Sequence, residues 1–372
     1  MDAVLLAAGK GTRLRPLTVS RPKPLVPVAN EPIMRFQLIL LERAGFDRVL
    51  VPVEYLGEQI VQYLKSLDTH LSFEFTFDNL DLGTAGAVGR LADRLDDTFA
   101  VISGDLLVDI DLEKMVDFHL SNEAAATIAL TRVEDPVHYG IALLEGNKIH
   151  RFLEKPDPSK VFSDTINAGI YVLEPSVLDA IPGECSFDFS KDLFPAIMEG
   201  AFIGGYRFDG YWNDIGRPSR YLQANGDALM GSFPIHRYVE EYRWMEGTNA
   251  VIGQRSRVGD VDISCPILMG DGCTVERGSV MQSFVVLGDR VSVGQDSTLD
   301  GVVVHEGTRI GPSANLRKCI IGRDCTIEDG VELAEGTVIG DGTKIGPSCR
   351  IGSNMKIWAG STLGAGTVIV PD

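Results

Sequence analysis

Residues 333–369 read LAEGTVIGDGTKIGPSCRIGSNMKIWAGSTLGAGTVI, and an aliphatic side chain recurs here at every sixth position. These recurring residues are Leu333, Ile339, Ile345, Ile351, Ile357, Leu363 and Ile369. The step of six runs back toward residue 252 with occasional intervals of five, and glycine often follows the aliphatic residue. Such a repeat is typical of a β-helix, where each coil has three short strands and each strand points one aliphatic residue at the axis. The end of the chain is therefore predicted to form stacked coils.

The first 230 residues follow a different pattern, in which strand-like apolar runs alternate with segments of helical periodicity. The predicted strands are 4–8, 48–53, 71–77 and 99–105, and the predicted helices are 32–45, 58–67 and 112–120. Alternation of this kind predicts an α/β domain with a mostly parallel sheet that is covered on both faces. The segment 231–249 follows neither pattern. We therefore predict a first domain over 1–230, a linker over 231–249 and a β-helix domain over 250–372.

Composition narrows the class of protein. The 372 residues carry a formal net charge of −18, which argues against general binding of nucleic acid. No run of 18 apolar residues occurs, and the start MDAVLLAAGKG resembles a buried strand more than a signal peptide. The six cysteines include no Cys-x-x-Cys pair, which favours free thiols in a reducing compartment. We expect a cytoplasmic protein that contacts neither membrane nor nucleic acid.

One short loop is basic, although the chain as a whole is acidic. Residues 9–23, GKGTRLRPLTVSRPK, contain five cations, and no Asp or Glu occurs from Ala3 to Asn30. A strand followed by Gly-x-Gly and basic residues suits a phosphate, because glycine lets backbone N–H groups approach oxygen atoms closely. The loop does not match the P-loop motif, which needs Ser or Thr where Gly11 follows Lys10. It does not match the dinucleotide-binding fingerprint either, because Leu14 stands where a third glycine is needed. The loop is nevertheless expected to meet an anionic ligand. Pro16, Pro22 and the adjoining Pro24 stiffen it, and five cations in a rigid loop repel one another unless an anion is bound.

Six motifs together resemble the sugar-phosphate nucleotidyltransferases, also called nucleoside-diphosphate-sugar pyrophosphorylases. They are AAGKGTRLRPLTVSRPKPLVPV (7–28), LGTAGA (82–87), SGD (103–105), FLEKP (152–156), NAGIYV (167–172) and WNDIG (212–216). They occur in the order of the family over residues 2–230, and a hexapeptide region follows them. The resemblance implies a Rossmann-like nucleotidyltransferase domain followed by a left-handed parallel β-helix. It also implies a reaction of a nucleoside triphosphate with a sugar 1-phosphate that yields a nucleotide-sugar and pyrophosphate.

The resemblance assigns roles to matching residues. The reacting groups are expected to be held by Arg13, Lys23, Asp105, Lys155 and Asp214, with Mg²⁺ on the carboxylates of Asp105 and Asp214. The nucleotide side is expected to comprise Leu6, Ala8, Gly9, Gly11, Thr12, Arg13, Gly83, Thr84, Ala85 and Gly104. The sugar-phosphate side is expected to comprise Gly86, Glu154, Lys155, Asn167 and Gly169. The roles of Lys10 and Arg15 stay open, and Asp111 better fits the N-cap of the helix at 112–120.

The identity of base and sugar follows only from finer resemblance. LGTAGA, SGDLLVDID and the late segment MKIWAG are more similar to guanylyltransferases that act on mannose 1-phosphate. The alternatives are a glucose-1-phosphate uridylyltransferase or thymidylyltransferase, a bifunctional N-acetylglucosamine-1-phosphate uridylyltransferase and acetyltransferase, and a non-catalytic regulatory relative. An acetyltransferase would need a base on the β-helix, where His305 is the only histidine and is expected to be an exposed corner residue. The open sides of the β-helix predict a homo-oligomer.

Overall fold

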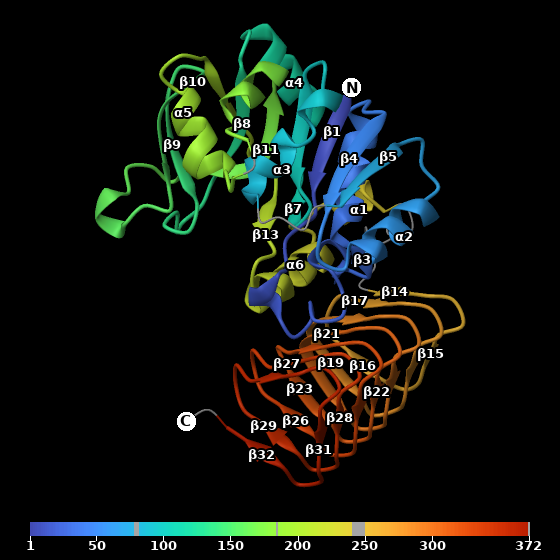
Figure 1. Cartoon of the computed structure of the whole chain (residues 1–372). Helices are drawn as coiled ribbons and strands as arrows, with labels where there is room; N and C mark the ends of the chain where they lie inside the picture. The colour runs from blue at the N-terminus through green and yellow to red at the C-terminus, as the bar shows by residue number, and fades with distance from the viewer. Residues whose placement is uncertain (78–81, 184, 240–249, 371–372) are drawn as a thin grey trace. The chain divides into compact units, whose positions relative to one another are not determined.

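The computed structural model describes residues 1–77, 82–183, 185–239 and 250–370, which fall into two compact units (Figure 1). Unit 1 consists of Met1–Gly9 and Met34–Trp212, and unit 2 consists of Lys10–Ile33 and Asn213–Asp372. The basic loop after Gly9 therefore belongs with the C-terminal strands. Of the predicted linker, residues 240–249 lie outside the described residues, whereas Ile235–Arg237 form a short 3-10 helix.

A nine-stranded sheet forms the centre of unit 1, in the order β5-β4-β1-β6-β11-β8-β12-β10-β9. Its strands are β1 (Asp2–Leu6), β4 (Arg48–Val53), β5 (Ser72–Phe77), β6 (Phe99–Ser103), β8 (Ala126–Arg132), β9 (Gly140–Glu145), β10 (Lys148–Glu154), β11 (Thr165–Leu173) and β12 (Ile203–Arg207). The four strands from β5 to β6 are parallel, in agreement with the alternating pattern. β11 runs antiparallel to β6 and to β8, and β9 and β10 are antiparallel to each other. The sheet is thus parallel on one side and mixed on the other.

In the described part of the chain, five α-helices accompany this sheet. They are α1 (Ile33–Arg43), α2 (Gly57–Ser66), α3 (Gly83–Gly89), α4 (Leu112–Ser121) and α5 (Phe194–Ile197). α1, α2 and α4 correspond to the three predicted helices, and the Asp111 carboxylate accepts a hydrogen bond from the Lys114 backbone N–H at 3.0 Å, so the predicted N-cap is confirmed. The same lysine lowers the pKa of Asp111 through its side-chain hydrogen bond. No described helix has the length and apolar character that crossing a membrane requires.

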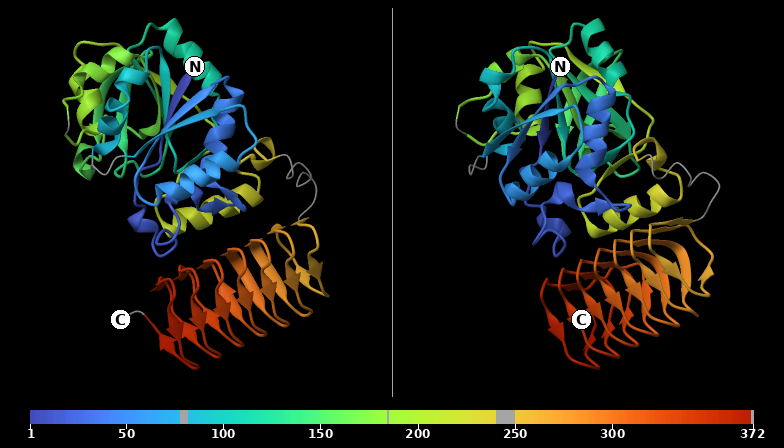
Figure 2. Two further views of the ribbon diagram at one scale, coloured as in Figure 1. Left: turned by 45° about the vertical axis from the view of Figure 1, so that its right-hand side comes forward. Right: turned by 90° about the vertical axis from the view of Figure 1, so that its right-hand side faces the viewer.

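Short parallel strands make up most of unit 2. They are β14 (Ala250–Ile252), β15 (Arg257–Val258), β16 (Asp262–Ile263), β17 (Ile267–Met269), β18 (Thr274–Val275), β19 (Val280–Leu287), β20 (Ser292–Val293), β21 (Thr298–Val304), β22 (Arg309–Ile310), β23 (Asn315–Arg317), β24 (Ile320–Ile321), β25 (Thr326–Ile327), β26 (Glu332–Leu333), β27 (Val338–Ile339), β28 (Lys344–Ile345), β29 (Arg350–Ile351), β30 (Lys356–Ile357), β31 (Thr362–Leu363) and β32 (Val368–Ile369). Figure 2 shows these strands, in orange to red, stacked in successive coils.

The strand register follows from the repeat length. Ile321 pairs with Ile339, and Ile339 pairs with Ile357, so each partner lies three six-residue steps further along the chain. Where an interval of five occurs the partner comes one residue sooner, as in the pairing of Val303 with Ile320. The hexapeptide pattern therefore predicts which residues lie above one another.

The aliphatic anchors form the core of the stacked strands. Ile321, Ile339 and Ile345 are fully buried in one continuous cluster that runs from Cys265 to Ile357. Leu363 and Ile369 occupy the same repeat position but are only partly buried, because no described coil follows them. Burial, and with it the stabilisation that each anchor provides, therefore decreases toward the last described coil.

The loop of Lys10–Ile33 and helix α6 (Pro218–Leu229) are fastened to these strands within unit 2. The Arg21 guanidinium forms an ion pair with Glu306 at 2.6 Å, and the Ser20 hydroxyl donates to Asp341 at 2.5 Å. Because Arg21 is only 8% exposed, it is an anchor of the loop rather than a cation that faces a ligand.

The expectation that His305 is an exposed corner residue is wrong. Its side chain is 4% exposed, and its Nε2 lies 2.8 Å from the hydroxyl of Tyr221 on α6. Burial, together with the charges of Arg21 and Arg323, holds the pKa of His305 well below its usual value. The sequence could not reveal this, because the partner lies 84 positions away on a helix. His305 is therefore a neutral core residue in unit 2.

Candidate active site

Two predicted motifs meet at neighbouring strand ends in unit 1. β1 and β6 are parallel and place Leu6 opposite Ser103, and the Gly104 N–H donates to the Leu6 carbonyl at 2.9 Å. Asp105 follows directly, and the Ser103 hydroxyl donates to its Oδ1 at 2.7 Å. The structure thus brings the end of β1 and the SGD motif to one edge of the sheet, where ligands of open α/β sheets bind.

Gly11 is required by its conformation and by its neighbours. Its φ of +58° favours glycine, and a Cβ atom there would lie 3.0 Å from Lys23 Cβ and 3.2 Å from Thr18 Cγ2. The Thr18 hydroxyl donates to the Gly11 carbonyl at 2.7 Å, which holds the turn. Gly9 differs, because a Cβ atom there would meet nothing within 4 Å. Thr12 and Arg13 follow the turn with exposed side chains.

Lys23 and Asp214 lie together in unit 2. The Lys23 ammonium is 3.7 Å from Asp214 Oδ1, and the side chains are 11% and 33% exposed. The pair joins the basic loop to the segment that precedes α6, although 190 residues separate the two positions in the sequence. The other predicted carboxylate, Asp105, belongs to unit 1.

The segment LGTAGA forms the beginning of α3 rather than an open loop, and it is tied to residues 187–189 in unit 1. Gly83 has φ +68°, and a Cβ atom there would lie 2.6 Å from the Phe187 carbonyl oxygen. The backbone N–H groups of Ala85 and Gly86 both donate to that same carbonyl, and both residues are buried. Thr84 is exposed but donates its hydroxyl to Asp188 at 2.9 Å. Of the four residues 83–86, Thr84 is therefore the exposed one.

Asn167 forms hydrogen bonds to protein groups through both its amide nitrogen and its amide oxygen. Its amide donates to the Tyr171 hydroxyl and to the Ser190 hydroxyl, both at 2.9 Å, and its Oδ1 accepts from the Gly169 N–H at 2.8 Å. Gly169 has φ +79° and lies at a register shift of β11. Asn167 thus fixes the turn that exposes the backbone of Gly169, which makes it a positioning residue. Burial raises the pKa of Tyr171, so its hydroxyl stays protonated in this network.

Glu154 and Lys155 form an ion pair at 3.1 Å with unequal burial. Glu154 is 14% exposed and Lys155 is 52% exposed. Gly140 makes room for the Glu154 carboxylate, because a Cβ atom there would lie 2.7 Å from Glu154 Oε2. Lys155 has φ +43°, which is costly for a residue with a side chain, and its N–H donates to the Tyr139 carbonyl at 3.0 Å. Strain of this kind is found at sites of function, and the side chain of this strained residue is half exposed.

Two aromatic residues that the motif analysis did not single out support this region. The indole N–H of Trp212 donates to the Ala168 carbonyl at 3.0 Å, beside Gly169. The ring of Tyr139 meets Trp212 edge to face, with 5.2 Å between the ring centres. These contacts connect the turn at Gly169 with the strained residue Lys155. Trp212 stands in the motif WNDIG, so its position was visible in the sequence, whereas the contact with Tyr139 was not.

Among the described residues, no group of three or more His, Cys, Asp or Glu side chains could hold a metal ion. These residues therefore form no metal site made of protein ligands alone. Asp105 and Asp214 each offer a partly exposed carboxylate. Carboxylates of this kind suit Mg²⁺, which commonly takes one or two protein ligands and completes its shell with waters and substrate phosphates.

Comparison with known proteins identifies the class. The nucleotidyl transferase family model matches residues 2–230, and the model of the GMPPB C-terminal domain matches residues 263–351. The chain is 33% identical to a UTP–glucose-1-phosphate uridylyltransferase of Synechocystis sp. over 348 residues, which cover 89% of each chain. It is also 33% identical to a mannose-1-phosphate guanylyltransferase of Mycobacterium tuberculosis over 315 residues, which cover 83% of this chain and 81% of the relative.

Among solved structures, HddC from Yersinia pseudotuberculosis complexed with GMP-PN matches with a TM-score of 0.52 and 26% identity. The match covers 60% of this chain and 97% of HddC. Since the nucleotidyl transferase model spans more than half of the chain, and relatives above 30% identity span more than four fifths of it, the chain belongs to the nucleotidyl transferase family and is a nucleotidyltransferase.

Proposed function

We propose that this nucleotidyltransferase transfers a guanylyl group from GTP to mannose 1-phosphate, giving GDP-mannose and pyrophosphate. The observation that carries the proposal is the similarity of residues 263–351 to the GMPPB C-terminal domain. It is supported by the relatives named mannose-1-phosphate guanylyltransferase in Mycobacterium tuberculosis and Arabidopsis thaliana, at 33% and 32% identity.

The proposed reaction needs no protein nucleophile. An oxygen of the sugar phosphate attacks the α-phosphorus of the triphosphate, and the bond from that phosphorus to the pyrophosphate oxygen breaks. Positioning and charge neutralisation then supply most of the catalysis. We assign Lys155 to the sugar phosphate, because its ammonium is exposed and its backbone is held by Tyr139. We assign Arg13, Lys23 and the turn at Gly11 to the triphosphate, since they form the basic loop.

Mg²⁺ is the proposed cofactor, with Asp105 and Asp214 as its protein ligands. The bound ion would neutralise phosphate charge and polarise the phosphorus–oxygen bonds. The hydrogen bond from Ser103 orients the Asp105 carboxylate, and Lys23 restrains Asp214. On the sugar side, Glu154 accepts hydrogen bonds from hydroxyl groups and the backbone of Gly169 lies against the ring.

A uridylyltransferase that acts on glucose 1-phosphate is the second candidate, because the Synechocystis relative carries that name at 33% identity over 89% of both chains. An additional acetyltransferase activity is not supported, since His305 is buried and hydrogen-bonded to Tyr221. A purely regulatory role is disfavoured by the presence of Arg13, Lys23, Asp105, Lys155 and Asp214 together.

We also propose an architecture for unit 2 and an assembly of the whole chain. The stacked coils of unit 2 form a left-handed parallel β-helix, for which the three columns of parallel strands and the buried anchors are the support.

The protein is a homo-oligomer that associates through these coils. Trp358, Val368 and Val370 are 56%, 60% and 64% exposed there, and apolar side chains of this kind are suited to contact with another chain. Light scattering should give the mass of more than one chain for the wild type and a lower mass for Trp358→Glu. An unchanged mass in the variant would contradict this interface.

The function is tested by pyrophosphate release. The purified protein is incubated with Mg²⁺, mannose 1-phosphate and, in turn, GTP, UTP, dTTP, ATP or CTP. We expect release with GTP alone. Release only with UTP and glucose 1-phosphate would establish the second candidate. Release with no pair of substrates would contradict catalysis by this chain under the proposed mechanism.

A further inference from the structure

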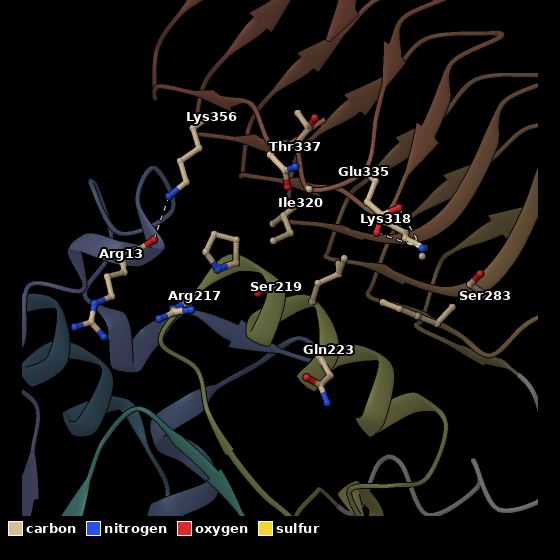
Figure 3. Close-up of a pocket in the computed structure, with 16 residues that line it drawn as sticks. Arg13, Arg217, Ser219, Gln223, Ser283, Lys318, Ile320, Glu335, Thr337 and Lys356 are labelled. Atoms are coloured by element: carbon tan, nitrogen blue, oxygen red, sulfur yellow. Dashed lines mark hydrogen bonds and ion pairs between the residues drawn. The ribbon is translucent and has the colours of Figure 1, made fainter. Parts of the chain in front are cut away.

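A cavity of about 750 Å³ lies within unit 2, between helix α6 and the C-terminal strands (Figure 3). We call it the α6 pocket. All its lining residues belong to unit 2, and neither Lys23 nor Asp214 is among them. Its size falls within the range of small-molecule sites in proteins. Of its lining residues, only Arg13 has a role in the function proposed for this chain, so most of the cavity has no assigned ligand.

The α6 pocket is basic in a strongly acidic protein. Four cationic side chains line it, Arg13, Arg217, Lys318 and Lys356, against one carboxylate, Glu335. Glu335 forms an ion pair with Lys318 at 3.2 Å. Within the described part of the chain, no carboxylate lies in ion-pair distance of the other three. Cations gathered in this way repel one another, and an anionic ligand relieves the repulsion.

The beginning of α6 adds a second attraction for anions. Its N-cap residue is Arg217, no side chain caps its first turn, and Pro218 and Ser219 line the pocket. The twelve-residue helix therefore presents uncapped N–H groups and the positive end of its dipole. Phosphate groups are frequent ligands of such helix ends.

The lining differs between the two ends of the pocket. Figure 3 shows Arg13, Arg217 and Lys356 at one end, and the Lys318–Glu335 pair with Ser283 at the other. The apolar side chains of Leu222, Phe284 and Ile320 also line the cavity. One end therefore suits phosphate oxygens. The other offers both donors and acceptors beside apolar surface, which suits the flat face and polar edge of a nucleobase.

We propose that the α6 pocket binds a nucleoside diphosphate, either free or esterified to a sugar, at a site separate from the Lys23–Asp214 pair. The diphosphate contacts Lys356, Arg217 and the first turn of α6, and the base lies toward Lys318 and Glu335. The α6 pocket is connected to the basic loop, because the Lys356 ammonium donates a hydrogen bond to the Arg13 carbonyl at 3.1 Å. A diphosphate that binds Lys356 competes with that hydrogen bond, so the ligand alters the turn that carries Arg13.

Equilibrium dialysis with labelled GDP, in the absence of other substrates, tests the proposal independently of catalysis. The double variant Lys318→Ala/Lys356→Ala should bind one GDP per chain fewer than the wild type. The matched control is Lys344→Ala/Arg350→Ala, which removes two exposed cations outside the pocket, each the first residue of a two-residue strand as Lys356 is. This control should bind as the wild type does. Equal binding by the wild type and the double variant would overturn the proposal.

A second variant removes space rather than charge. Ser219 is exposed and lines the pocket, so Ser219→Trp should fill it without disturbing a core and should also remove one GDP per chain. Competition then identifies the ligand. Unlabelled GDP and GDP-mannose should each displace the label from this site, and the better competitor distinguishes the free from the esterified form. If inorganic pyrophosphate competes as well as GDP does, the base is not recognised and the proposal fails.

Discussion

Asp105→Asn is expected to lower kcat/KM for pyrophosphate release by about 1000-fold, because it removes one carboxylate charge from the proposed Mg²⁺ site. Asparagine has the same shape and can still accept the hydrogen bond that Ser103 donates at 2.7 Å, so the strand end should keep its structure. The Mg²⁺ concentration that gives half of the maximal rate should rise as well. Initial rates across a magnesium titration measure both effects.

The matched control is Asp111→Asn in the same segment after β6. Asp111 caps α4 through the Lys114 backbone N–H, and asparagine is an equally good N-cap. Its activity and magnesium dependence should therefore stay near those of the wild type. Equal losses in the two variants would show that Asp105 acts through the fold of this segment and not through the metal.

Ile339→Ala should reduce the stability of the stacked coils by about 2–5 kcal/mol, because it leaves a cavity in a fully packed core. Ile339 is fully buried, and the coils above and below place Ile321 and Ile357 on either side of it. Hydrogen exchange of residues 320–357 in increasing urea measures the loss where it occurs. A global melting temperature is less informative, because unfolding of repeat arrays and of several units need not be two-state.

Ile369→Ala provides the comparison within the same repeat position. Among the described residues Ile369 pairs with Ile351 alone, and it is partly buried, so the loss should be less than about 1 kcal/mol. Similar losses at the two positions would contradict the view that burial between neighbouring coils stabilises unit 2.

Much of the architecture follows from local sequence. The anchors recur at a fixed step, and both their burial and their register in the coils follow from that step. Asp111 caps α4 because an N-cap bond needs only a neighbour three residues away. The strand ends of β1 and β6 meet because parallel strands present their carboxyl ends at one edge. In each instance the deciding interaction spans a short stretch or repeats a regular pattern.

The partners of individual polar residues do not follow from the sequence. Arg21 and Lys23 stand two positions apart in one basic loop, yet Arg21 pairs with Glu306 in the coils and Lys23 pairs with Asp214 before α6. Asn167 lies in a motif that we predicted for the sugar side, but its amide donates to the hydroxyls of Tyr171 and Ser190. Each of these pairings selects one partner among many similar side chains, and only the folded chain brings that partner within reach.

The sequence by itself thus determined the family, the repeat and the register of the coils, because periodicity and contiguous motifs are local properties. It also supplied the residues of the proposed site. The tertiary structure alone decided that the basic loop of Lys10–Ile33 belongs with the C-terminal strands, that His305 is a buried and neutral residue, and that Arg13, Arg217, Lys318 and Lys356 line one cavity. These features depend on contacts between residues far apart in the chain, and such contacts arise from the packing of complete elements against one another.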